Sequence, residues 1–360
     1  MSEYRPLIAG VDTLEVGYSV GGFRLSDDEW AGLQAAKLAA QSTPYKNDYG
    51  HVTLRGQTFN VARGGAARYT YLLTNDDVRL RVSEKALGGR YYPEVHAAFN
   101  SAYLWREQWK RAADNLELWV RDWADVDATT IARSDLTLDV CGPMPLLTPD
   151  LREVVTRARS RSERGAFEFE RNSTSGGVET YRFGKNDLLG RIYDKRKEAL
   201  KSHKQWFEAL WDSQGWEPEE PVTRVEFQCR RKFLRKYQVN TVADLDMEMA
   251  DLWKYLTGRW LTIREVADDG HRHRWPTSDF WQCVENGEEC FGTLTGVTRL
   301  DAYFGETRPA ARAKVATRPE QSGRVIGGSD AGHGHDFSSS LPSVQWCVGR
   351  GSLTQVHLPL

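Results

Sequence analysis

Polar side chains that could carry out chemistry recur at every second position of three short segments. Such alternation is typical of strands with one apolar and one polar face. The polar positions of residues 131–140 and 222–230 include charged and amide groups, namely Arg133, Asp135, Asp139, Arg224, Glu226, Gln228 and Arg230. In the third segment, 190–195, Arg191, Tyr193 and Lys195 share one parity. If the three strands are neighbours, one sheet face brings together carboxylates, a tyrosine and several cations.

This set of groups suits the chemistry of a phosphodiester bond. Carboxylate oxygens are preferred ligands of Mg²⁺ or Mn²⁺, and such sites leave positions for water and phosphate oxygens. Tyrosine is a poor nucleophile at its usual pKa of about 10, so it needs nearby positive charge or a metal that favours the phenolate. Arg191 and Lys195, two residues to either side of Tyr193, would supply that charge. Parity alone favours a plainer interpretation, in which these residues form salt bridges on the exposed face of an antiparallel sheet.

Five segments resemble motifs of the trans-type replication initiation factor family, which is found in rolling-circle plasmids, phages and integrative elements. In chain order they are ARSDLTLD (132–139), ETYRFGKND (179–187), GRIYDKRKEAL (190–200), TRVEFQCRRKFL (223–234) and RWPTSDFW (274–281). The third resembles the tyrosine motif of that family, and the fourth is similar to its downstream glutamate strand. The resemblance spans about residues 8–305. Because the five motifs occur in the family's order and spacing, the nicking interpretation is favoured over the salt-bridge interpretation that parity alone supports.

The resemblance implies an enzyme that nicks DNA at a replication origin and so initiates rolling-circle replication. Tyr193 would attack a phosphodiester, which leaves a 5′-phosphotyrosyl link and a free 3′-hydroxyl. Arg191 and Lys195 would stabilise charge in the transition state, and Mg²⁺ or Mn²⁺ would polarise the scissile phosphate. The implied metal ligands are Asp135 and Glu226, with Asp139 and Asp12 as further candidates.

Two other functions remain open for the same residues. One is a relaxase that nicks an integrative or conjugative element for transfer, and the other is a non-catalytic DNA-binding regulator. In the regulator, the acidic residues would only balance the basic ones. The chain departs from the best-known plasmid members of the family in its tryptophan-rich segment 100–125 and its glycine-rich tail. The details of origin binding therefore do not transfer.

Positive charge gathers near the candidate chemistry, although the net charge of the whole chain is −2. Residues 151–200 carry 12 Lys and Arg against 8 Asp and Glu. The predicted DNA-binding residues are Arg133, Arg224, Arg230, Arg231, Lys232, Arg235 and Lys236. Origin DNA, as a single strand or a hairpin, would be the partner. A separate helicase is expected because no GxxxxGK[ST] motif occurs, and the resemblance implies a possible homodimer.

The periodicity of the chain predicts an α+β fold with a central, largely antiparallel sheet. Helices would pack on one face of the sheet, and the polar face would bind DNA. Strands are expected at 7–20, 131–140, 167–171, 178–184, 190–194 and 222–230, with an antiparallel meander within 51–84. Helices are expected at 26–41, 93–122, 148–160, 195–213 and 241–263. Residues 1–305 would form the nicking domain, which could be built from two β-rich halves. Residues 306–360 would form a partly flexible extension.

Other features narrow the class of protein. The sequence has no apolar run of membrane-spanning length and no basic and apolar leader at its start, which predicts a cytoplasmic protein without a membrane partner. The five cysteines are odd in number and never form a CxxC pair, so reduced thiols are expected. His271 and His273 are discounted as a metal pair because Arg272, rather than a hydrophobic residue, separates them.

Overall fold

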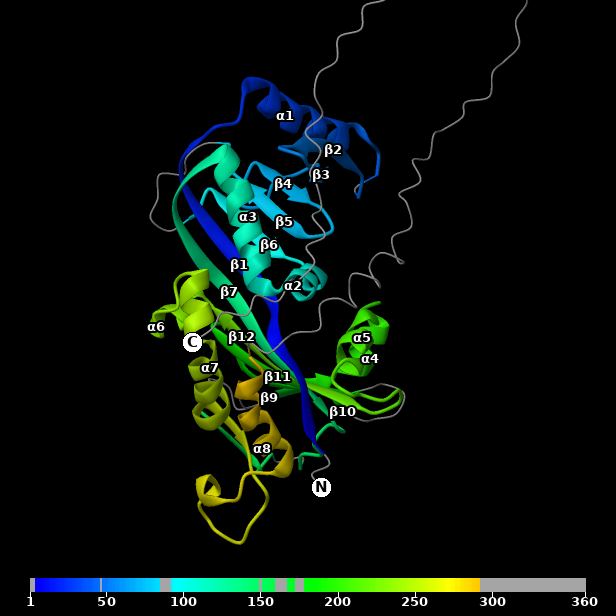
Figure 1. The fold of residues 1–360 in the computed structure, drawn as a ribbon, viewed down its shortest axis with the longest axis vertical. Coiled ribbons are helices and arrows are strands. Elements are labelled where there is room, and N and C mark those ends of the chain that lie inside the picture. The colour runs from blue at the N-terminus through cyan, green and yellow to red at the C-terminus, as the bar shows by residue number, and fades with distance from the viewer. Residues whose placement is uncertain are drawn as a thin grey trace, which may run out of the picture. The chain divides into compact units, whose positions relative to one another are not determined.

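The computed structural model describes residues 4–45, 47–84, 92–148, 151–158, 167–171 and 178–291. Within these residues, eleven strands form one sheet in which every pairing is antiparallel (Figure 1). In sheet order the strands are β2 (Tyr49–Leu54), β3 (Gln57–Ala62), β4 (Tyr71–Thr74), β5 (Val78–Val82), β6 (Val95–Phe99), β1 (Arg5–Phe23), β7 (Ala124–Cys141), β12 (Val222–Arg230), β11 (Leu188–Asp194), β10 (Val178–Lys185) and β9 (Phe167–Arg171). The predicted α+β fold with an antiparallel sheet is confirmed.

Two long central strands join the two ends of the sheet. β1 and β7 pair along almost their whole length, with several register shifts where one strand bulges. The meander β2 to β6 continues from β1, and β12, β11, β10 and β9 continue from β7. Figure 1 shows β1 and β7 running lengthwise between these two groups of strands.

Eight α-helices flank the sheet in the part of the chain that is described. They are α1 (Asp27–Ser42), α2 (Ser101–Glu107), α3 (Trp109–Trp123), α4 (Lys195–Lys201), α5 (Trp206–Asp212), α6 (Arg231–Lys236), α7 (Val242–Tyr255) and α8 (Asp279–Asn286). The capping box predicted at Ser26 is present, because Ser26 and Glu29 exchange hydrogen bonds at the start of α1. No helix among the described residues is long and apolar enough to cross a bilayer.

Two hydrophobic cores cover opposite sides of the central strands. In the larger core, Trp253 of α7 meets Phe227 of β12 edge to face, at 5.4 Å between ring centroids. The smaller core gathers Trp105, Phe207 and Trp211 from α2 and α5 against the start of β1. Helices therefore also lie on part of the face that was predicted to be polar, and this second core encloses some of its charged residues.

Four of the expected helices differ from the observed elements. In the interval 241–263, α7 ends at Tyr255, and residues 261–263 form a strand that pairs with residues 154–156. The interval 93–122 begins with β6, because residues 95–99 pair with β1 and β5, and the helix that follows is broken at Gln108, where φ is 64°. Residues 154–156 form a strand, β8 (Val154–Thr156), that pairs with β13 (Leu261–Ile263). The interval 195–213 splits into α4 and α5 at His203, where φ is 56°. In each case a tertiary pairing or a backbone turn overrides local helix preference.

Other expectations fall outside the described residues. These are the loop 172–177, the end of the predicted domain after residue 291, and the extension 306–360.

Candidate active site

The three strands with alternating polar residues are neighbours in the sheet, as the proposed active face requires. β12 lies between β7 and β11. Its Gln228 pairs with Asp135 of β7, and its Glu226 pairs with Arg191 of β11. Arg224 lies between Asp139 on one side and Tyr193 on the other. One face of three adjacent strands therefore carries the predicted carboxylates, arginines and tyrosine together.

Tyr193 and Glu226 make the most direct contact in this group. The Tyr193 hydroxyl donates a hydrogen bond to Oε2 of Glu226 at 2.8 Å. The other carboxylate oxygen, Oε1, lies 2.7 Å from Nη2 of Arg191. Tyr193 is 8% exposed and Glu226 6% exposed, so both groups lie mostly out of water. The phenol is thus held against a carboxylate that an arginine orients from its other side.

Burial and this carboxylate together set the proton on Tyr193. Burial raises the pKa of the Tyr193 phenol well above its ordinary value of 10, and the negative charge of Glu226 raises it further. We had expected Arg191 and Lys195 to favour the phenolate, and the structure shows the opposite shift in this resting arrangement. Tyr193 is therefore a neutral phenol whose proton points at a base.

Lys195 lies in a different environment from the one predicted. It begins α4, is 1% exposed, and its ammonium donates to Glu198. The same ammonium lies 4.2 Å from the centre of the Phe207 ring and 5.9 Å from that of Tyr193. Burial, followed by the charge of Arg224, lowers the pKa of Lys195. Lys195 is therefore a buried cation close to the ring of Tyr193.

Asp135 of β7 is the second carboxylate of the group, and it is 1% exposed. Arg133 grips it in a bidentate pair, with Nε 2.7 Å from Oδ1, and Nη2 of Arg191 lies 3.5 Å from Oδ2. Burial raises the pKa of Asp135 to about 7, and the charge of Glu226 adds to that shift against the opposing effect of Arg133 and Arg191. Asp135 and Glu226, on adjacent strands, thus share Arg191 between them.

Asp139, Asp12 and Arg224 form a buried ionic cluster instead of the predicted metal and DNA contacts. Arg224 is 0% exposed and makes a bidentate pair with Asp139, with Nη2 2.8 Å from Oδ2. Its Nη1 lies 3.1 Å from Oδ1 of Asp12. Burial opposes the Asp12 carboxylate, but Arg224 and two lysines outweigh it and lower its pKa well below the usual range. Because Arg224 is enclosed, it does not face DNA, and both aspartates already have a cation partner.

Residues from distant helices complete this cluster, and sequence analysis did not anticipate them. Trp211 of α5 donates from Nε1 to Asp139 at 2.8 Å. Ser101 and Trp105 of α2 each donate to Oδ1 of Asp12 at 2.8 Å. Gly10 lets the Trp105 ring lie directly on β1, since a Cβ there would come within 3.0 Å of that ring. Parity arguments on strands carry no information about such helical donors.

A cavity of about 370 Å³ opens beside Tyr193, Glu226 and Asp135. Basic residues from four elements line it together with these groups, namely Arg133, Arg182, Arg191, Lys195 and Lys204. Arg182, Lys204 and Glu198 were not predicted as site residues. Arg182 is a polar position of β10, which pairs with β11, so its parity could have identified it. The cavity joins a tyrosine, the four carboxylates of Asp12, Asp135, Glu198 and Glu226, and five cations, and this excess of cations suits an anionic substrate.

The donor set fits a divalent cation of the Mg²⁺ type through Asp135 and Glu226. Such ions use one or two protein carboxylates and complete their shell with water and phosphate oxygens. Burial is the main cause of the raised pKa of Asp135, and both carboxylates already contact arginines, so an ion here would replace part of these contacts. In the described part of the chain, no group of three or more His, Cys, Asp or Glu side chains is arranged to hold a metal. Any ion here would rest on two carboxylates.

The remaining basic residues continue from the polar face onto α6. Arg230 is exposed and pairs with Arg133 in the sheet, so it extends the polar face beyond Asp135. Lys232, Arg235 and Lys236 are exposed on α6, and Lys232 lies 3.2 Å from Asp187. Arg231 donates to the Val239 carbonyl and is only partly exposed.

Comparison with known proteins gives a structural likeness to a replication protein. No family model and no curated protein match the chain. A solved structure of a rolling circle replication initiator protein from Geobacillus stearothermophilus has a TM-score of 0.45 and 14% sequence identity to this chain. The alignment covers 79% of this chain and 96% of that one.

We expect Asp135→Asn to stabilise the protein in chelator at pH 8 but not at pH 4. The folded pKa of about 7 exceeds the unfolded value of about 3.9, so the folded state binds more protons between these limits. Wild-type stability therefore falls as the pH rises from 4 through 7, and the Asn variant lacks this loss. Thermal melts should show a Tm gain of roughly a few degrees at pH 8. The exposed Asp125→Asn is the control, and a lower Tm for Asp135→Asn at pH 8 would contradict this account.

Asp139→Asn should have the opposite effect. It leaves the buried Arg224 without its bidentate partner, and breaking such a pair costs about 3–5 kcal/mol. The Tm should therefore fall by several degrees in chelator, and added Mn²⁺ should not change the difference. If Asp139 were a metal ligand with no structural role, the variant would melt in chelator like the wild type.

Proposed function

We propose that the chain nicks DNA at a replication origin through attack of Tyr193 on a phosphodiester, and so initiates rolling-circle replication. The observation that carries this proposal is the hydrogen bond from the Tyr193 hydroxyl to Glu226, at the wall of a cavity lined by cations. The hydroxyl thus lies within reach of both a base and the space where an anionic substrate would enter. The sequence motifs that resemble those of replication initiation factors supply the expectation of origin DNA.

Glu226 serves as the general base in this mechanism. As the Tyr193 oxygen attacks phosphorus, its proton passes to Oε2 of Glu226 over the 2.8 Å hydrogen bond. The bond between phosphorus and the 3′ oxygen breaks, and that oxygen takes up a proton from solvent. The products are a 5′-phosphotyrosyl link and a 3′-hydroxyl that can prime synthesis. Because a base accepts the proton during attack, the high pKa of the resting phenol does not prevent the reaction.

The arginines of the site have separate roles in the proposal. Arg191 holds Oε1 of Glu226 and presents positive charge where the attacked phosphate gains negative charge. Arg133 keeps Asp135 in place, and Arg182 and Lys204 attract the DNA backbone to the cavity. When Mg²⁺ or Mn²⁺ is bound, Asp135 and Glu226 would hold it, and the ion would polarise the scissile phosphate.

The buried cluster of Arg224, Asp139 and Asp12 supports this chemistry by holding the strands of the site together. Arg224 is the sheet partner of Tyr193, so the cluster fixes the strand that carries the base against the strand that carries the nucleophile. A relaxase would use the same chemistry on a different element. The helicase and the homodimer remain predictions that rest on the sequence.

We expect Tyr193→Phe to abolish nicking and the covalent adduct while origin affinity changes less than about threefold, because only the attacking oxygen is removed. Supercoiled DNA that carries the origin, incubated with protein and Mg²⁺ or Mn²⁺, gives the readout as a nicked circle joined to protein. Tyr18→Phe, a buried tyrosine of β1 outside the cavity, is the control and should retain activity. An adduct formed by the Tyr193→Phe variant would remove the tyrosine from the mechanism.

Arg230→Ala and Arg235→Ala should weaken DNA binding and flatten its salt dependence. Each exposed cation that contacts a phosphate contributes about one unit to the slope of log affinity against log salt. Arg24→Ala serves as the control, because Arg24 is an exposed arginine between β1 and α1 that does not line the Tyr193 cavity. If the slope is unchanged in both variants, the DNA does not cross the region from Arg230 to α6.

A further inference from the structure

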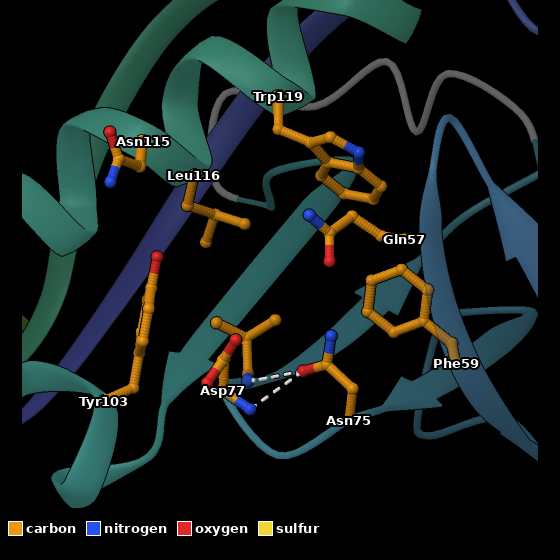
Figure 2. Close-up of a pocket in the computed structure, with 9 residues that line it drawn as sticks. Gln57, Phe59, Asn75, Asp77, Tyr103, Asn115, Leu116 and Trp119 are labelled. Atoms are coloured by element: carbon orange, nitrogen blue, oxygen red, sulfur yellow. Dashed lines mark hydrogen bonds between the residues drawn. The ribbon is translucent and has the colours of Figure 1, made fainter. Parts of the chain in front are cut away.

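Helix α2 borders two different sites. Ser101 and Trp105, one turn apart, bond Asp12 of the buried ionic cluster. Tyr103, between them in sequence, lines a separate cavity of about 290 Å³ beside the meander (Figure 2). This second cavity is near the lower end of the size range for small-ligand sites, roughly 300 Å³. Nothing in the proposed nicking mechanism uses it.

The lining of this cavity combines aromatic rings with amides. The rings come from β3, α2 and α3, and they belong to Phe59, Tyr103 and Trp119. The amides are Gln57, Asn75 and Asn115. Figure 2 shows Gln57 and Asn75 reaching into the space that Tyr103 and Trp119 border from other sides. Asn75 is held in place because its Oδ1 accepts hydrogen bonds from the backbone N–H groups of Asp77 and Val78.

The charges at this cavity disfavour an anionic ligand. Among its described lining residues there is no lysine or arginine, and Asp77 is the one charged residue. Nη2 of Arg106 lies 2.8 Å from Oδ1 of Asp77, so that charge is already paired. Phosphate is therefore not the group that would enter. A neutral, planar ring with hydrogen-bonding edges matches the aromatic walls and the amides.

We propose that this cavity receives one unpaired nucleobase of the DNA strand that the active site engages, an inference that rests on the proposed function. Aromatic side chains stack on any base, and asparagine and glutamine amides form paired hydrogen bonds with base edges. The cations at the Tyr193 cavity bind the backbone, whereas the second cavity takes the base. Helix α2 provides a common wall, since it contacts Asp12 on one side and lines the base cavity on the other.

The test measures single-strand binding in full-length Tyr193→Phe protein with chelator, so that no cleavage is needed. The probes are labelled 12-nucleotide strands of dA, dC or dT, and a matched strand of abasic sugar phosphates, followed by fluorescence anisotropy. The variant is Gln57→Ala with Asn115→Ala; both residues are exposed, and Ala is well tolerated at these surface positions. The matched control is Thr58→Ala with Leu118→Ala, which alters exposed neighbours that do not line the cavity.

We expect the Gln57/Asn115 variant to bind at least one base-containing strand about tenfold more weakly, with unchanged binding of the abasic strand and no effect in the control. Equal losses on base-containing and abasic strands, or no loss on any strand, would overturn the proposal. Free deoxynucleosides form a second arm. If they bind in a manner that depends on Gln57 and Asn115 while no strand does, the cavity serves a small heteroaromatic molecule and the DNA assignment is wrong. Base-dependent binding here, combined with no adduct when the wild-type protein is incubated with origin DNA and Mg²⁺ or Mn²⁺, would instead leave this cavity assigned and overturn the nicking proposal.

Discussion

The buried pairing of Arg224 with Asp139 and Asp12 is the interaction on which the candidate site depends. Arg224 projects from β12 and binds carboxylates of β7 and β1, so one guanidinium fixes three strands of the sheet. A one-residue slip of β12 would turn Arg224 to the apolar face and leave the two carboxylates buried without a partner. The register that avoids this cost also places Glu226 beside Arg191 and Tyr193.

The polar face thus divides into a part that holds the fold and a part that is available for chemistry. The smaller core covers Arg224, Asp139 and Asp12, and the indole N–H groups of Trp105 and Trp211 satisfy the carboxylates there. Asp135, Glu226 and Tyr193 line the open cavity, and Asp12 of the cluster lines it as well. Asp135 and Asp139 lie four positions apart on β7 and differ in their partners. Arg224 and Trp211 hold Asp139, whereas Asp135 lies at the cavity beside Arg133 and Arg191.

Strand parity predicted a large part of this site, and it failed where helices decide the outcome. Alternation placed Asp135, Glu226 and Tyr193 on one face, and the sheet order confirms that their strands are adjacent. Parity placed Asp139 on the same polar face as Asp135 and could not distinguish them. Asp139 is buried under α5, which depends on packing between residues more than seventy positions apart in sequence. The interval 93–122 shows the same limit of sequence-based prediction. Its residues 95–99 form strand β6, which hydrogen-bonds to β1 and β5, although their local pattern predicts a helix.

The most direct measurement of the central claim identifies the atom that becomes joined to DNA. A strand with the origin's scissile phosphate and a bridging sulfur in place of the 3′ oxygen would trap the covalent intermediate, because the released thiol rejoins poorly. After proteolysis, mass spectrometry should find the 5′-phosphorylated fragment on Tyr193, in the peptide that follows Arg191. Attachment to any other residue, or cleavage of the strand with no attached peptide, would contradict the account.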